Sequence, residues 1–340
     1  MKIIWDWSLD SETDRLLDVA NGIGNGFFAL QGFCPLPWPS TSKHSIASSV
    51  YLPSLNYISI PNFWSSVAKL DSRQYPLVTS KSLFNSTKSL LSSISLLPPN
   101  YGELERLTST TVPQVINFIK KFISNITLPS ELLIRPTHFG TGGSFSLIDD
   151  SGKITIYLRI DKGIKTIVEC LLTSLLRGNA MQELAASWSE TEFLTDWLIT
   201  SSALSTILPA DPTWESTLST TRRSVSTALQ AQSAHFLAQI SAPTPTSQTF
   251  LAKSGQIYFG DCPLSSLTSR EVALMTRLVA KSPAPLTLDE IGDLIFNQED
   301  KFSLAAISKT IERLRTKLES SGISRYYLAT ASGVGYYLKN

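Results

Sequence analysis

The sequence predicts an α+β protein built from two parts. Three observations support this prediction. Helix-like and strand-like patterns are mixed between residues 100 and 240, a segment rich in Pro and Ser/Thr follows at 241–248, and the last ninety residues hold three amphipathic stretches followed by a glycine-containing hairpin. We therefore expect an N-terminal mixed α+β region over 1–240, a linker at 241–249 and a C-terminal domain over 250–340. A subdivision of the first region near residue 100 stays open.

Residues 1–100 contain aromatic side chains that are interrupted often by proline and serine, as in CPLPWPSTSKHS. This pattern favours short strands and loops over long helices. The glycine-rich GIGNG at 22–26 fits a loop, because no strand–helix–strand pattern surrounds it. A helix is indicated at 81–97, where it stops at Pro98-Pro99.

From residue 100 to 240 the hydrophobic pattern predicts helices at 112–126, 165–177, 187–204 and 221–240. Strand-like runs lie at 131–137, 143–149 and 153–159, and a hairpin turn at Asp149–Gly152 joins the second run to the third. The short GTGGS at 140–144 lacks the Lys-Ser/Thr of a phosphate-binding loop and fits a turn. Trp188 and Trp197 are expected in the core, and His138 is expected in a surface loop.

After the linker, strands are predicted at 255–260 and 263–267, and helices follow at 268–282, 286–296 and 304–320. The third helix buries residues that recur at intervals of four, three and four, which is one face of an α-helix; they are Ile307, Ile311, Leu314 and Leu318. The runs RYYLAT and GYYLK then flank Ser332-Gly333-Val334, which predicts a β-hairpin with a tight turn.

These pieces resemble the OmpR/PhoB-type effector domain, a winged helix-turn-helix. The resemblance covers about 255–340 and rests on LTSREVALMTRLV, PLTLDEI, ISKTIERLRTKLE and YLATASGVGYYL in that order. It implies a DNA-binding domain of three helices with flanking strands, in which the third helix enters the major groove and the terminal hairpin is the wing. The chain would then be a cytoplasmic transcription regulator that binds double-stranded DNA.

The third helix carries basic and hydroxyl side chains that suit contacts with phosphates and base edges. The resemblance assigns DNA contacts to this helix and to the wing; the residues are Lys309, Thr310, Arg313, Arg315, Lys317, Arg325, Ser332 and Tyr336. Glu312 and Glu319 make the charge of this helix mixed. The wing tip, Ala331-Ser332, departs from the bulky or basic residue common in the family.

Two alternatives stay open. A winged helix can also serve as a protein–protein surface, and the net charge of only +1 permits this. The second alternative is a small metallopeptidase-like fold at 131–200, with Glu169, Cys170 and Thr173 where a zinc motif would lie and Glu190 or Glu192 as a later ligand. The three histidines, at 44, 138 and 235, do not have the spacing of a zinc motif, so any such fold would be catalytically inactive.

Composition excludes several other classes of protein. The chain is 42% hydrophobic and contains 32 aromatic residues, which excludes a disordered chain. Cys34, Cys170 and Cys262 lie far apart and indicate reduced thiols rather than a zinc or disulfide framework. No run of eighteen apolar residues occurs, and no acidic pair opens the chain as a phosphate-receiving domain would require. We expect no cofactor, no metal, no catalytic residue and no membrane; beyond DNA, the expected partners are a second copy of the chain, RNA polymerase or another protein.

Overall fold

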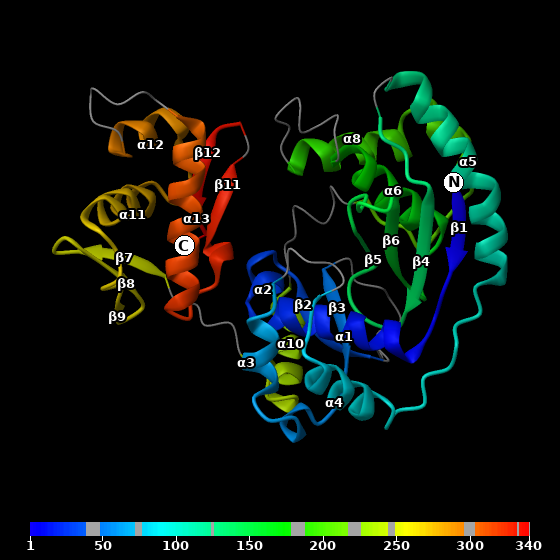
Figure 1. The fold of residues 1–340 in the computed structure, drawn as a ribbon, viewed down its shortest axis with the longest axis horizontal. Helices are drawn as coiled ribbons and strands as arrows, with labels where there is room; N and C mark the ends of the chain where they lie inside the picture. The colour runs from blue at the N-terminus through cyan, green and yellow to red at the C-terminus, as the bar shows by residue number, and fades with distance from the viewer. Residues whose placement is uncertain are drawn as a thin grey trace. The chain divides into compact units, whose positions relative to one another are not determined.

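The computed structural model describes residues 1–38, 48–71, 77–123, 126–177, 188–216, 226–243, 249–295, 303–331 and 333–339. The chain divides into two compact units, Met1–Thr244 and Pro245–Asn340 (Figure 1). The predicted linker falls partly outside the described residues, at 244–248. Within the described ranges, no helix combines the length and the apolar character needed to cross a lipid bilayer.

The N-terminal unit is organised around a mixed four-stranded sheet with the strand order β1-β4-β6-β5. Strands β1 (Lys2–Trp5), β4 (Glu131–Thr137) and β6 (Lys153–Arg159) pair in parallel. The short β5 (Gly143–Phe145) pairs antiparallel with β6 through the predicted hairpin. Helices α5 (Gly102–Phe122), α6 (Ile164–Arg177) and α8 (Trp188–Thr200) share one hydrophobic core with this sheet (Figure 1).

A second core in this unit is built mostly from helices. It lies around α1 (Leu9–Gly24), which begins with a capping box between Ser8 and Ser11. Two short strands, β2 (Cys34–Trp38) and β3 (Ser49–Pro53), pair in parallel beside it. The other elements around this core are α2 (Phe27–Leu30), η1 (Tyr57–Ser59), α3 (Phe63–Ala68), α4 (Lys81–Leu91) and α10 (Thr227–Gln239), whereas η2 (Ala203–Thr206) packs in the core of the four-stranded sheet.

Several expectations for this unit were wrong. The first three residues of GIGNG are not a loop, because α1 runs to Gly24 and packs so closely on α3 that a Cβ at Gly24 would lie 3.2 Å from the Cβ of Ala68. Gly24 therefore serves helix packing, whereas Gly26, with a φ of 76°, lies in the turn between α1 and α2. The parallel pairing of β1, β4 and β6 was not indicated by the sequence pattern. The helix predicted from 112 begins ten residues earlier, at Gly102.

Two side chains in this unit also lie opposite to expectation. His138 is buried, and its Nδ1 lies 2.6 Å from Oε1 of the buried Glu12, so it is not in a surface loop. Trp197 is 47% exposed and is not part of the core; the side chain of Trp188 lies outside the described residues. Hydrophobicity alone did not show which face of α8 is buried.

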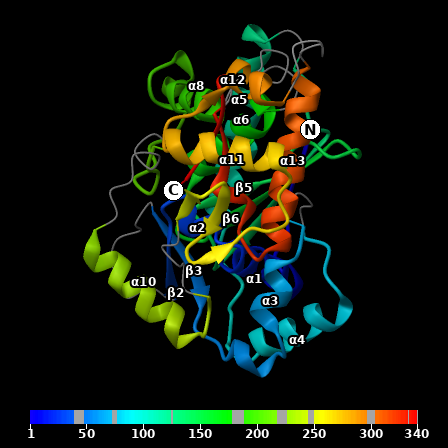
Figure 2. The same cartoon turned by 90° about the vertical axis from the view of Figure 1, so that its left-hand side faces the viewer.

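The C-terminal unit has the winged-helix order of elements. An antiparallel sheet of β7 (Phe250–Lys253), β8 (Gln256–Phe259) and β9 (Cys262–Pro263) comes first. Helices α11 (Ser269–Lys281), α12 (Leu288–Ile295) and α13 (Leu304–Ser320) follow, and α11 lies across α13 (Figure 2). The wing is the hairpin of β11 (Leu328–Ala331) and β12 (Gly335–Leu338).

Side chains cap all three of these helices. Thr268 and Glu271 form a capping box at α11, Thr287 Oγ1 accepts from the backbone N–H of Glu290 at α12, and Ser303 caps α13. The predicted stripe of α13 is buried, together with apolar residues of α11 and α12; these are Leu274, Met275, Leu278 and Ile291. The helical part of the prediction is therefore confirmed.

The strands of this unit differ from the prediction in four places, the first of which is β7, a strand that was not predicted. The strand expected at 263–267 is limited to Cys262–Pro263. Leu286–Thr287 is a strand, β10, that pairs with β12, so the wing belongs to a three-stranded sheet. Residues Arg325–Tyr327 form a 3₁₀ turn, η3, ahead of β11. Gly335 permits the β10–β12 pairing, because a Cβ there would collide with the carbonyl oxygen of Leu286.

Candidate nucleic-acid interface

Helix α13 has one buried side and one side open to solvent. Its four core residues are fully buried, whereas Ser308, Lys309, Glu312, Arg313 and Thr316 are exposed. No hydrogen bond or ion pair of the Lys309 side chain occurs among the described residues. The open side therefore presents two cations, one carboxylate and two hydroxyls.

Toward α11, two cations of α13 share one buried carboxylate. Arg313 Nε lies 2.9 Å from Glu271 Oε1, and Lys317 Nζ lies 2.6 Å from Glu271 Oε2. Lys317 Nζ also donates to the carbonyl oxygen of Ser266, at 2.8 Å. The Arg313 side chain stays 59% exposed, and only its Nε is engaged among the described residues, so its terminal amino groups are available to a ligand.

Glu271 remains ionised because of these partners. Burial alone would raise its pKa, but the hydrogen bonds from Lys317, Thr268 and Arg313 outweigh burial and lower the pKa to about 2. The carboxylate therefore has two functions, since it also completes the capping box of α11. The sequence indicated the cap but not the pairing with α13.

Toward the wing, Arg315 joins α13 to β11. Its Nε and Nη2 donate to the carbonyl oxygen of Leu328 at 3.0 and 2.8 Å, and Nη2 also donates to Thr330 Oγ1 at 3.0 Å. Its guanidinium lies 5.8 Å from the centre of the Tyr336 ring. With an exposed fraction of only 15%, this side chain holds the wing against the helix.

Glu312 also accepts bonds on this side. Arg315 Nη1 and Arg325 Nη2 each lie 2.6 Å from one of its two oxygens. Arg325 Nη1 lies 3.4 Å from Glu319 Oε2. The guanidinium of Arg325, on η3, therefore lies between two carboxylates of α13.

The predicted site residues therefore fall into three groups. Lys309 and Arg313 lie on the open side of α13. Arg315, Lys317 and Arg325 have their charges engaged by neighbouring groups, and the Thr310 hydroxyl donates to the carbonyl oxygen of Ala306 within the helix. Tyr336 is buried at 9% exposure between β10 and β11, which is a correction to its expected place on the wing surface. Ser332 lies outside the described residues.

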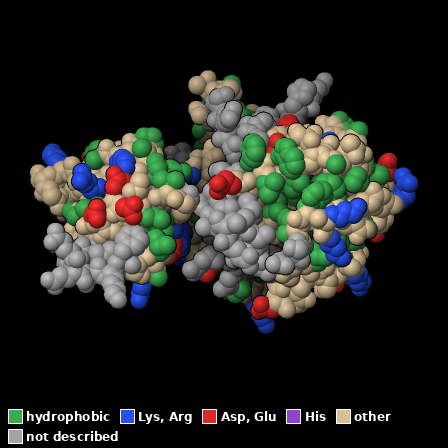
Figure 3. Space-filling view, turned by 90° about the horizontal axis from the view of Figure 1, so that it is seen from above, with side chains coloured by type: hydrophobic (Ala, Val, Ile, Leu, Met, Phe, Trp, Pro, Cys, Tyr) green, Lys and Arg blue, Asp and Glu red, His purple; other side chains and the backbone are tan. Residues whose placement is uncertain are grey.

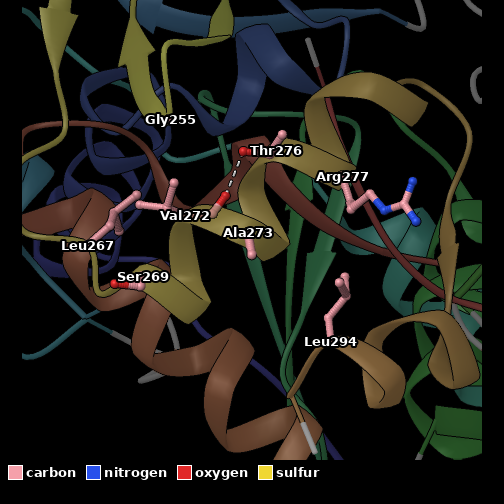
Figure 4. Close-up of a pocket in the computed structure, with 8 residues that line it drawn as sticks. All are labelled: Gly255, Leu267, Ser269, Val272, Ala273, Thr276, Arg277 and Leu294. Atoms are coloured by element: carbon pink, nitrogen blue, oxygen red, sulfur yellow. Dashed lines mark hydrogen bonds between the residues drawn. The ribbon is translucent and has the colours of Figure 1, made fainter.

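An open hollow of about 550 Å³ lies on another face of this unit (Figure 4). Side chains of α11, including Val272, Thr276 and Arg277, line it together with Leu294 of α12. None of the residues predicted to contact DNA borders it. It is therefore separate from the open side of α13.

Nothing in the described ranges supports the metallopeptidase resemblance. No group of three His, Cys, Asp or Glu side chains there is placed to hold a metal ion. Glu169 accepts a hydrogen bond from Trp214 Nε1 at 2.9 Å, and Cys170 and Thr173 are buried in the core. These side chains pack the helix α6 rather than form a metal site.

Comparison with known proteins concerns the C-terminal unit. Residues 264–338 match the family described as "Transcriptional regulatory protein, C terminal". The chain is 33% identical over 84 residues to Protein RcaC of Microchaete diplosiphon. The aligned segment makes up 25% of this chain and 13% of that protein. It is 34% identical over 74 residues to the transcriptional regulatory protein TctD of Salmonella typhimurium. That aligned segment makes up 22% of this chain and 32% of that protein.

The similarity therefore spans less than a third of the length of these curated relatives. No solved structure matches the chain. The matched segment begins directly after β9 and runs through all three helices to the end of the wing. Residues 264–338 are a winged-helix domain of the OmpR/PhoB type.

Proposed function

We propose that this protein is a transcription regulator that binds double-stranded DNA through residues 250–340, with the open side of α13 in the major groove. One observation carries the proposal: a domain of the transcriptional-regulator family presents Lys309 and Arg313 on the solvent side of the helix whose opposite side is core. The protein acts by reversible binding, without bond chemistry, cofactor or metal.

In this proposal the residues predicted to contact DNA have different roles. Lys309 and the terminal amino groups of Arg313 contact phosphates or base edges. Lys317 and Arg325 lie at the edges of the open side of α13. They strengthen the positive potential there, although each already has a carboxylate partner. Arg315 positions the wing. Ser332, which the sequence assigns to the wing tip, contacts the DNA backbone in this proposal.

The N-terminal region supplies the second part of the function. Residues 1–240 form a separate domain, joined by the linker 241–249, that senses a signal or forms a homodimer. Apolar side chains gather on the face of the N-terminal unit that Figure 3 shows. Phe193 and Trp197, one turn apart on α8, are 60% and 47% exposed, which supports an oligomerisation surface. RNA polymerase is a further partner, and because its target is chromosomal DNA we place the protein in the cytoplasm.

Fluorescence anisotropy with labelled duplexes at low salt tests the proposal. Arg313→Ala should weaken binding to every duplex by about five- to tenfold, because a phosphate or base contact is lost whatever the sequence. Arg277→Ala, which removes an exposed cation on the far side of α11, is the matched control and should bind as the wild type does. Equal affinity of Arg313→Ala and wild type would contradict the placement of α13.

The mixed charge of the domain favours a second candidate, a protein–protein surface. Side chains of both signs are interspersed on the face shown in Figure 3, and Glu312 lies on the open side of α13. If the wild type binds no duplex at low salt, this candidate replaces the first. Salt-dependent binding of duplexes would exclude it as the main function.

A further inference from the structure

Glu312 is a carboxylate on the side of α13 that we propose to face DNA. It lies in the middle of the helix, one turn from Ser308, Lys309 and Thr316, and its side chain is 48% exposed. A free carboxylate here would repel phosphates and weaken binding. The presence of Glu312 on the open side of α13 therefore needs a physical explanation.

The carboxylate is fixed in place rather than free. Arg315 Nη1 donates to Oε1 and Arg325 Nη2 donates to Oε2, each at 2.6 Å, and the two arginines come from different elements. Both arginines neutralise the charge that phosphates would meet. A carboxylate has about four lone-pair positions, so with these two bonds made it can still accept further hydrogen bonds from a ligand on its exposed side.

The ionisation state limits what the group can bind. Burial raises the pKa of Glu312, but the bonds and charges of Arg315 and Arg325 lower it below its ordinary value. At neutral pH the side chain only accepts hydrogen bonds.

Among the four bases, one matches such an acceptor in the major groove. Guanine presents two acceptors, and thymine presents an acceptor and a methyl group. Adenine presents an amino donor beside the N7 acceptor, which would repel a carboxylate. Cytosine presents only its N4 amino group, so it is the base that a fixed carboxylate selects.

We propose that Glu312 determines sequence specificity by accepting a hydrogen bond from the N4 amino group of a cytosine in the major groove. The inference rests on the proposed function, since it requires α13 to lie in the groove. Arg315 and Arg325 are positioning residues for this contact, because they hold the carboxylate without touching the base.

Selection of bound sequences from a random duplex pool, with the full-length chain, tests the inference. The wild type should enrich sites that share a cytosine at one position. Glu312→Gln should change the preferred base at that position to adenine, because an amide can pair with both N6 and N7 of adenine. The ratio of its affinities for the cytosine and adenine sites should shift by roughly five- to a hundredfold. Glu319→Gln, which alters another exposed carboxylate of α13, should select the wild-type sites.

A second measurement avoids any dependence on the folding of a variant. The wild-type chain is titrated with the selected duplex in which that cytosine is replaced by an analogue without the 4-amino group, and affinity should fall roughly five- to a hundredfold. Unchanged affinity, or a Glu312→Gln variant that selects the same base with uniformly weaker binding, would overturn the contact. Failure of the wild type to enrich any duplex would instead overturn the proposed function.

Discussion

The two sides of α13 use the same kinds of side chain in opposite ways. On the α11 side, the cations Arg313 and Lys317 share Glu271, and the carboxylate is the buried partner. On the wing side, the cations Arg315 and Arg325 share Glu312, and here the arginines are the less exposed partners. The first arrangement leaves a guanidinium in solvent, and the second leaves a carboxylate there.

This difference teaches that a count of basic residues overstates what a helix offers to DNA. Five cations were predicted to contact DNA, yet only Lys309 and Arg313 lie fully on the open side. Where the acid is buried, its partner Arg313 stays exposed to a ligand, and where the arginines are the less exposed partners, Glu312 stays exposed. The two sides should therefore respond differently to substitution, to pH and to salt.

Removing the buried acid should have the largest effect. Glu271→Ala removes the capping box and two charge-assisted hydrogen bonds, and it should lower the free energy of unfolding of the C-terminal unit by about 3 kcal/mol. Hydrogen exchange measured by mass spectrometry on the full chain should show faster exchange in α11 and α13. Glu312→Ala, on the more exposed side, should change the exchange of these helices far less.

The tryptophans provide an internal control for this experiment. All seven lie between residues 5 and 214, so tryptophan fluorescence follows the N-terminal unit alone. The urea midpoint seen by fluorescence should be the same in wild type and Glu271→Ala. A shifted midpoint would mean that the two units unfold together and would contradict the proposed separate domains.

Lowering the pH should remove the stabilisation that Glu271 gives to the wild-type protein. Because the folded-state pKa of Glu271 is lowered from 4.5 to about 2, its stabilisation is complete above pH 4.5 and is lost as the pH falls toward 2. The difference in unfolding free energy between wild type and Glu271→Gln should shrink by about 2 kcal/mol over that window, since the exposed partner Arg313 is screened by solvent. Urea unfolding followed by circular dichroism at several pH values measures it. A constant difference would show that Glu271 is not held ionised by α13.

On the wing side, the less exposed Arg315 should matter more for stability than the more exposed Glu312. Arg315→Ala removes the bonds to Leu328 and Thr330 and should destabilise the wing by about 1 kcal/mol. Hydrogen exchange of the peptide covering 328–338 should accelerate, while α11 is unchanged. Arg325→Ala serves as the comparison, and equal acceleration in both variants would contradict the bracing role of Arg315.

The helices of the C-terminal unit were predictable because their signals are local. The stripe Ile307, Ile311, Leu314 and Leu318 needs only helical periodicity, and Thr268 with Glu271 needs only a capping pattern. The pairing of Glu271 with Arg313 was not predictable, because it joins residues 42 positions apart. The burial of Tyr336 follows from β10, whose two residues are too short a strand to be recognised in a sequence.

The N-terminal unit was less predictable because its sheet is assembled from distant segments. Strand β1 at residues 2–5 pairs with β4 at 131–134, and nothing in the sequence of either strand identifies its partner. The glycines of α1 have the composition of a loop, although Gly22 is required by the close approach of Phe28 and Gly24 by that of α3. Long-range pairing and helix–helix contact leave little trace in a single sequence.

The salt dependence of duplex binding tests most directly that α13 meets DNA through Arg313, on its open side, and not through Arg315. Affinity of the full chain for one duplex is measured by anisotropy at several salt concentrations for wild type, Arg313→Ala and Arg315→Ala. Each lost phosphate contact reduces the slope of log affinity against log salt by about 0.9. We predict this reduction for Arg313→Ala and an unchanged slope for Arg315→Ala; the reverse result, or equal slopes in all three proteins, would contradict the account.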